Sequence, residues 1–236
     1  EAESGNSKYA NKWSEPIDKA PTIVGNLADN ILKALKVSTK QEITKAPTKN
    51  TEAYQYYLKA KYQFDKRENQ EDIEIVRGLL EKAIELDNNL IYAKILMGST
   101  YDEMGDFDKA IKIHTQTLIQ CKKLGNKIGI GYSLHNIGVI HDIMGDYDTA
   151  LDYYIRSLEI DEELANKYGI AITLHTIGVT YQNIGNFEKA IIYYTRSLKI
   201  EKELGNKHGI GNLYNSIGIY YDEIGKYEIA IDYYIR

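Results

Sequence analysis

The sequence predicts an all-α protein, a solenoid of about five helix pairs with an extra helix in front. Residues 125–164 and 165–204 are two copies of one pattern, and a third copy opens at Gly205. Two residue series advance in steps of 40: Gly98, Gly138, Gly178 and Gly218, and Ala110, Ala150, Ala190 and Ala230. Self-similarity at such a period predicts stacked units, each of which buries its apolar face against its neighbours.

Composition narrows the class of protein. Hydrophobic residues make up 43% of the 236 residues and charged residues 27%, as in globular chains. The net charge of −5 argues against nucleic acid as a partner. The single cysteine, Cys121, excludes an intrachain disulfide and predicts a reducing compartment, the cytoplasm. No apolar run approaches about 18 residues, so we predict no membrane insertion by this chain.

The ends of the sequence suggest a piece of a longer protein, because it begins without methionine and stops inside a repeat. Residues 1–20 are predicted to be a linker or the end of a preceding domain. Residues 21–50 are predicted to form an amphipathic helix and a polar connection. The apolar residues Ile23, Leu27 and Ile31 share one face of this helix. We expect it to cap the first pair, since an uncapped solenoid end exposes its apolar face.

The repeat array is predicted over residues 51–236, with its last pair incomplete. The first helices of the pairs are predicted at 51–66, 90–104, 126–144, 167–184 and 207–224. The second helices are predicted at 71–86, 107–123, 147–163, 187–203 and from 227 onward. In the first helix of the array, i, i+3 and i+4 spacing predicts one mostly apolar face, formed by Tyr54, Tyr57, Leu58, Lys61 and Tyr62.

Turn residues mark the boundaries between helices. Gly105, Gly145, Gly185 and Gly225 stand where a left-handed residue ends a helix. Asp106, Asp146 and Asn186 follow and are predicted to cap the next helix, whereas Lys226 cannot. Ala165 stands where the other spacers carry glycine, which weakens the case for a left-handed cap there.

The repeat resembles the tetratricopeptide motif. The residues that carry this resemblance in one copy are Leu134, Ile137, Gly138, His141, Ala150 and Tyr154. The resemblance covers residues 51–236 and implies a right-handed superhelix whose first helices line a concave face. We expect the glycine to let two helices approach and the aromatic to fill the space between repeats. His114 replaces that aromatic in the divergent copy, and His141, at a tyrosine position, is expected to be a packed core side chain.

A second, shorter resemblance concerns the start of the chain. Residues 1–37 and the stretch AYQYYLKAKYQFDKR are similar to the junction that leads into the repeats of bacterial class III adenylate/guanylate cyclases. This implies a cyclase-type signalling protein as the parent, with its catalytic domain outside this chain. The chain itself shows no catalytic motif, and we predict no cofactor and no metal.

The predicted partner-binding groove follows from the register of the motif. Its residues are Tyr92, Ser99, Asp102, Glu103, His135, Asn136, Val139, Asp142, His175, Thr176, Val179, Gln182, Asn212, Asn215, Ser216, Ile219 and Asp222. Asparagine and histidine can both donate to and accept from a peptide backbone. The recurring aspartates at 102, 142 and 222 form an acidic line, which predicts a protein or peptide partner with basic side chains. The alternative is a polar surface that is merely solvated.

Three other features have simpler interpretations than a chemical site. His135 and His175 lie one repeat apart, and helix axes about 8–10 Å apart make a shared metal ion unfavourable. Cys121 precedes two lysines that could lower its pKa, but a half-buried thiol is the better interpretation. In the tyrosine pairs, such as Tyr153-Tyr154, the second residue is expected to pack between repeats and the first to lie at the surface.

Three functions remain open from the sequence. The leading one is a protein-interaction or sensory module of a bacterial signalling protein. The second is a structural spacer or oligomerisation element, and the third, a catalytic chain, has no residue pattern behind it. Ile231, Tyr234 and Ile235 would lie open at the carboxyl end, which predicts self-association.

Overall fold

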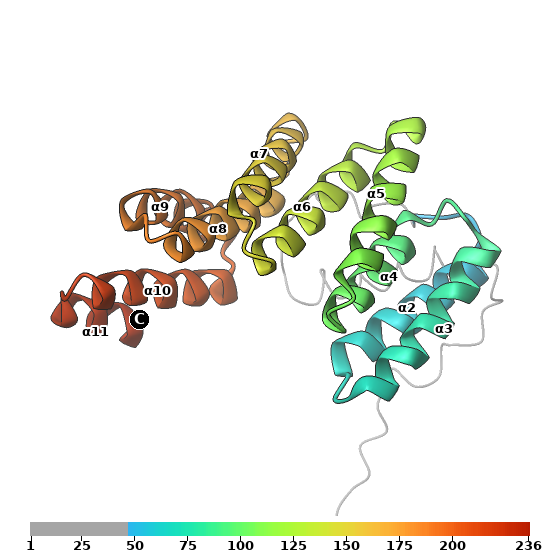
Figure 1. Ribbon diagram of the computed structural model, residues 1–236, viewed down its shortest axis with the longest axis horizontal. Coiled ribbons are helices and arrows are strands. Elements are labelled where there is room, and N and C mark those ends of the chain that lie inside the picture. The colour runs from blue at the N-terminus through green and yellow to red at the C-terminus, as the bar shows by residue number, and fades with distance from the viewer. Residues whose placement is uncertain (1–46) are drawn as a thin grey trace, which may run out of the picture. The chain divides into compact units, whose positions relative to one another are not determined.

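The computed structural model describes residues 47–236, which form ten helices and no strand (Figure 1). These are α2 (Thr51–Lys66), α3 (Gln70–Leu86), α4 (Ile91–Glu103), α5 (Phe107–Leu124), α6 (Lys127–Ile143), α7 (Tyr147–Glu163), α8 (Lys167–Asn183), α9 (Phe187–Leu204), α10 (Lys207–Glu223) and α11 (Tyr227–Ile235). The all-α prediction and the five helix pairs are confirmed. The predicted linker and amphipathic helix lie outside the described residues. No helix of the described part is long and apolar enough to cross a membrane.

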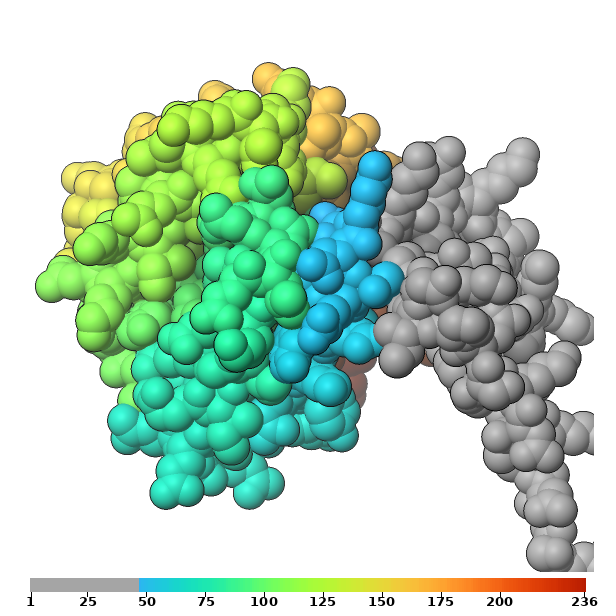
Figure 2. Space-filling view, turned by 90° about the vertical axis from the view of Figure 1, so that its right-hand side faces the viewer, coloured from blue at the N-terminus to red at the C-terminus, as the bar shows by residue number. Residues whose placement is uncertain are grey.

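The chain divides into two compact units, and the boundary falls inside α4 after Ala93. In the first unit, α3 buries Ile73, Val76 and Leu80, while α2 buries only Ala53 and Ala60. Figure 2 shows the surface of α2 and α3 in blue and cyan.

The predicted apolar face of α2 was wrong at Leu58 and Tyr62, whereas its other two tyrosines are half-buried. Leu58 is 37% exposed and Tyr62 is 65% exposed. The buried positions are instead Ala53 and Ala60, seven residues apart and therefore on one side of the helix. Their small side chains allow close packing, which an apolar pattern dominated by tyrosine concealed.

In the second unit, residues 94–236, the apolar cores lie between successive pairs. Leu118 of α5 clusters with Leu134 and Ile137 of α6. Tyr154 of α7 clusters with Leu174 and Ile177 of α8 in the same way. The corresponding cluster of α9 and α10 contains Ala190, Tyr194, Leu213 and Ile217. Each pair therefore completes the core of the pair before it, as expected for a repeat array.

A glycine and an aromatic ring join the two helices within each pair of the second unit. A Cβ atom added to Gly138 would lie 2.8 Å from the Tyr154 ring, and one added to Gly178 would lie 2.6 Å from the Tyr194 ring. The same contact joins Gly98 to His114, at 2.5 Å. Tyr154 and Tyr194 therefore each pack against the glycine of their own pair and against the core residues of the next pair.

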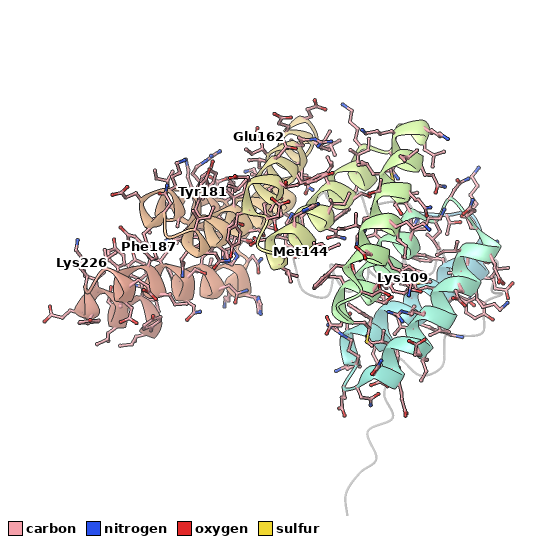
Figure 3. The ribbon with its side chains drawn as sticks, viewed as in Figure 1. Lys109, Met144, Glu162, Tyr181, Phe187 and Lys226 are labelled. Carbon is pink, nitrogen blue, oxygen red and sulfur yellow. The ribbon has the colours of Figure 1, made fainter. Side chains whose placement is uncertain are left out.

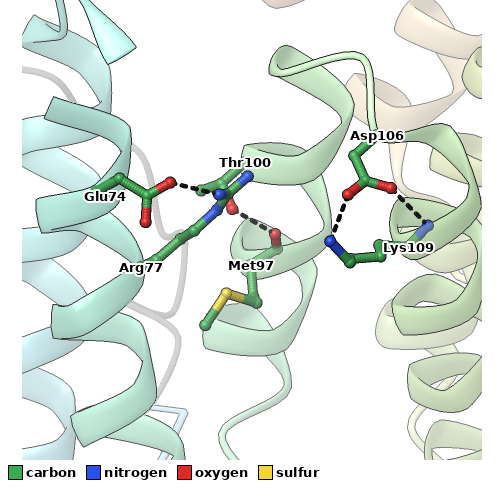
Figure 4. A network of polar contacts seen from close by, with 6 residues as sticks. All are labelled: Glu74, Arg77, Met97, Thr100, Asp106 and Lys109. Carbon is green, nitrogen blue, oxygen red and sulfur yellow. Dashed lines mark hydrogen bonds and ion pairs between the residues drawn. The ribbon is translucent and has the colours of Figure 1, made fainter. Parts of the chain in front are cut away.

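The turns follow the predicted residues. The four intra-pair glycines have φ between 72° and 81°. Asp106, Asp146 and Asn186 cap α5, α7 and α9, whereas no side chain caps α11, which Lys226 precedes (Figure 3). Asp106 also pairs with Lys109, at 2.7 Å (Figure 4).

Ala165 departs from the expectation for its turn. It adopts φ 50°, in the left-handed region that Gly125 and Gly205 occupy at the equivalent turns. The surrounding turn imposes this conformation, because the Asn166 side chain caps α8 and the Asn166 backbone N–H donates to the Asp161 carbonyl, at 2.8 Å. An L-residue held there carries strain of about 1–2 kcal/mol.

Candidate partner-binding face

The predicted groove residues of the second unit lie on α4, α6, α8 and α10. We call this surface the first-helix face; its residues are Ser99, Asp102, Glu103, His135, Asn136, Asp142, His175, Thr176, Gln182, Asn212, Asn215, Ser216 and Asp222. Tyr92 belongs to the first unit instead, where its ring lies 6.3 Å from that of Tyr57. Val139 and Val179 are half-buried and pack against the cores of Tyr154 and Tyr194.

Hydrogen bonds join successive first helices across this face. The Nε2 atom of His175 on α8 lies 2.9 Å from the Ser216 hydroxyl on α10. The Nδ1 atom of His135 on α6 lies 3.4 Å from the Thr173 hydroxyl on α8. These histidines therefore bind one pair to the next rather than standing free for a partner.

Asp142 and Gln182 make the same kind of connection. The Asp142 carboxylate accepts hydrogen bonds from Thr180 on the next first helix, at 2.5 Å, and from the Tyr154 hydroxyl, at 3.4 Å. The Gln182 amide oxygen accepts from the Tyr194 hydroxyl, at 2.8 Å. The tyrosine that fills the core thus also orients the polar side chain on the first-helix face.

Burial sets the protonation of the ionisable groups near this face. It lowers the pKa of His135 to about 4 and lowers that of His175, so both rings are neutral at pH 7. Burial raises the pKa of Tyr194 to about 12. The pKa of Asp102 is raised by burial and, secondarily, by the charge of Glu103.

Several other polar side chains of the first-helix face bond within their own helix or make no side-chain hydrogen bond in the described part of the chain. Thr176 and Ser99 donate to carbonyls of their own helices. Asn136 is half-buried and Asn215 is exposed, and neither takes part in a side-chain hydrogen bond among residues 47–236. Their amides can each donate and accept. Asn212 lies near His208, at 3.3 Å, and Asp222 is exposed.

The predicted environment of His141 was wrong. His141 is not a core residue: its side chain is 21% exposed, stacks on the Tyr153 ring at 5.7 Å and lies 3.1 Å from the Asp146 carboxylate. Tyr181 occupies the same repeat position as His141, one period later (Figure 3). Its ring stacks on that of Tyr193, with the ring centroids 5.5 Å apart. The position faces the first tyrosine of the pair at the edge of the core.

Cys121 is fully buried rather than half-buried. Burial raises the pKa of its thiol, and the nearby Lys94 offsets only part of this effect. The lysines that follow Cys121 do not activate it. Across residues 47–236, no three His, Cys, Asp or Glu side chains converge to hold a metal ion.

The sequence did not reveal the buried acids in the last turns of α7 and α9. Asp161 is 8% exposed and Glu201 is 4% exposed, one period apart. A Cβ added to Gly169 would lie 2.5 Å from the Asp161 carboxyl, and one added to Gly209 would lie 2.6 Å from that of Glu201. The recurrence of an acid eight residues before a glycine was the available signal.

Comparison with known proteins agrees with this geometry. A family model described as tetratricopeptide repeat matches residues 89–163 and 169–236, more than half of the chain. The chain therefore belongs to the tetratricopeptide repeat family, whose fold is that of protein–protein interaction modules. No curated protein sequence matches it.

Several solved structures share the fold at low sequence identity. BtubC (BKLC) from P. vanneervenii has 17% identity and a TM-score of 0.66, over 92% of this chain and 89% of that one. A Rap protein complexed with competence and sporulation factor has 18% identity and a TM-score of 0.68, over 92% and 59%. A STAND signal transduction ATPase with a tetratricopeptide repeat sensor, from Pyrococcus horikoshii, has 21% identity and a TM-score of 0.62, over 91% and 34%.

Proposed function

We propose that this chain is a sensory module of a bacterial, cytoplasmic signalling protein and binds a peptide or protein partner on its first-helix face. The observation that carries this proposal is the contrast between two kinds of side chain there. His135, His175 and Asp142 are fixed by bonds between pairs, whereas Asn136 and Asn215 remain available. Fixed surroundings reduce the entropy lost when available groups bind a partner.

Charge favours a basic partner. Asp102, Glu103, Asp142 and Asp222 place carboxylates along the first-helix face. Such an acidic line attracts a basic segment over distances of about a Debye length, ~8–10 Å at physiological salt.

The signalling context rests on resemblance. The amino-terminal residues are similar to the junction of bacterial class III nucleotidyl cyclases, and the chain would then report to a catalytic domain elsewhere in its parent. The similarity in fold to a STAND protein with a tetratricopeptide repeat sensor, and to a Rap protein complexed with competence and sporulation factor, supports the sensory role.

A peptide selection tests the binding face. A random peptide library is panned on the whole chain, and enriched peptides are measured against Asn136→Ala/Asn215→Ala and against a control, Glu159→Ala/Lys199→Ala, altered at exposed second-helix positions. We expect the first variant to lose about tenfold or more in affinity, about 1.4 kcal/mol, and the control to lose none. Equal affinity in both variants, at unchanged helicity, would refute the proposal. His175 is left intact because its bond to Ser216 is structural.

A second candidate function is an oligomerisation element or spacer of a cyclase-type enzyme. The exposed apolar side chains of α11 favour it: Tyr227 is 64% exposed, Ile231 56% and Ile235 79%. Sedimentation at high concentration should then show self-association that Ile231→Asp/Ile235→Asp abolishes. A monomeric mass at every concentration would exclude an oligomerisation element.

A further inference from the structure

Asp102 differs from its counterparts on the first-helix face. One period later, Asp142 accepts hydrogen bonds from Thr180 and Tyr154. Two periods later, Gln182 accepts one from Tyr194. The Oδ1 atom of Asp102 is buried and has no hydrogen-bond partner among residues 47–236. A buried carboxylate oxygen without a hydrogen-bond donor costs folding free energy. A ligand that donates a hydrogen bond to Asp102 would therefore be stabilised there.

Two sequence differences remove the donors. The aromatic position of this pair is His114 rather than tyrosine, and it has no hydroxyl to extend toward Asp102. The counterpart of Thr180 is Ile140, 40 residues earlier, whose side chain has no donor. The site therefore lacks both groups that satisfy Asp142.

His114, on the second helix of the same pair, carries a second unpartnered group. Its side chain is 1% exposed, and its Nδ1 atom has no hydrogen-bond partner among the described residues. The polar edge of the ring lies against Gly98, one helical turn before Asp102 on α4. The His114 ring therefore packs on the same face of α4 as Asp102, one helical turn before it.

We propose that the Asp102–His114 site takes a cationic side chain, an arginine or a lysine of the partner that binds the first-helix face. This inference rests on the proposed function. Arginine and lysine offer only donors, whereas a carboxylate and the unprotonated nitrogen of a neutral imidazole are acceptors. Charge-assisted bonds to a carboxylate are short and strong. Glu103 adds a second negative charge beside the site.

The site also discriminates between partners. An apolar or acidic side chain would leave the Asp102 oxygen unpaired, so it would be rejected. Asp142 and Gln182 offer no such selection, because tyrosine hydroxyls already occupy them.

A small cation tests the site directly. The whole chain is titrated with N-acetyl-arginine amide, or with the neutral N-acetyl-citrulline amide of nearly the same shape, while NMR follows the His114 ring. We expect the arginine compound to bind about tenfold more tightly or better. Asp102→Asn should reduce its binding to the citrulline level, and the control Asp148→Asn, at an exposed acid of α7, should retain it. His114→Tyr, which supplies the missing hydroxyl, should abolish it.

Equal binding of the two compounds, or unchanged binding by Asp102→Asn, would overturn the inference. If His114→Tyr unfolds, as circular dichroism would show, Asp102→Asn alone decides the outcome. Library peptides that depend on Asn136 and Asn215 but carry no basic residue would refute this inference and leave the proposed function standing. Arginine binding at Asp102 without any peptide binding would refute the proposed function and leave the cation site standing.

Discussion

The pairs α8–α9 and α10–α11 share the same motif but differ in burial. Tyr194 is 1% exposed, whereas Tyr234, at the same repeat position, is 46% exposed. Both rings face a glycine on the first helix of their pair, Gly178 and Gly218. The difference lies in the neighbouring pair, because Leu213 and Ile217 of α10 complete the core around Tyr194. Within residues 47–236, no further pair covers Tyr234.

The motif alone therefore does not bury its aromatic residue. The glycine positions the ring, and the next pair removes it from water. The stability of each pair is thus a property of its neighbour, as in a one-dimensional array.

Removing the two tyrosines should have the largest and most unequal effect. Tyr194→Ala should cost about 3–5 kcal/mol, because a fully buried ring and its bond to Gln182 are lost. Tyr234→Ala should cost less than about 1 kcal/mol, as for surface positions. Urea unfolding followed by helicity measures both. Equal losses would show that burial by the next pair does not matter.

His114 extends the comparison to the pair α4–α5, where an imidazole takes the aromatic position. Burial lowers its pKa from 6.5 to about 4. As the pH falls below 6.5, the unfolded chain takes up the proton first, so stability is lost between pH 6.5 and about 4. The loss from this group is about 3 kcal/mol, at ~1.36 kcal/mol per pKa unit.

Unfolding measured from pH 7 to pH 4 tests this dependence. His114→Phe should remove its share of the slope and leave the shares of His135 and His175. An unchanged slope in His114→Phe would contradict the burial of a neutral ring.

Single methyl groups sharpen the comparison further. Gly178→Ala should cost about 1–3 kcal/mol, because the added carbon meets the Tyr194 ring at 2.6 Å and the Ala190 carbonyl at 3.3 Å. Gly218→Ala meets the Tyr234 ring but should cost less, since that ring can swing into solvent. The control, Gly211→Ala, meets nothing within 4 Å and should stabilise α10 by up to about 1 kcal/mol. Thermal unfolding ranks the three, and a different order would refute the packing described.

The smallest effect concerns the spacer turns after α7 and α9. Ala165→Gly should stabilise the chain by up to about 1 kcal/mol by relieving the left-handed strain. Gly205→Ala should destabilise it by a similar amount, because φ is 67° there. Thermal unfolding of the two variants checks this, and shifts of the same sign would contradict it.

The sequence predicted the fold well because its signals are periodic. Helix ends, caps and the Gly178–Tyr194 contact follow from residues that recur in register. The face of α2 was missed because Ala53 and Ala60, rather than the tyrosines, are buried. Ala165 was missed because tertiary structure overrode its local preference.

The candidate site was predictable only in position. The motif places His175 and Asp142 on the first helices, but their partners, Ser216 and Thr180, stand on the next pair. A bond between pairs depends on side-chain directions that no single repeat specifies. The unpartnered oxygen of Asp102 became visible only when its neighbours were in place.

Native-state hydrogen exchange tests most directly whether each pair is stabilised by the next. It reports the opening free energy of each helix separately. Stabilisation by the nearest neighbour predicts that opening free energies fall from α8–α9 through α10 to α11, whose amides should exchange fastest. The same opening free energy across α8 to α11 would contradict it.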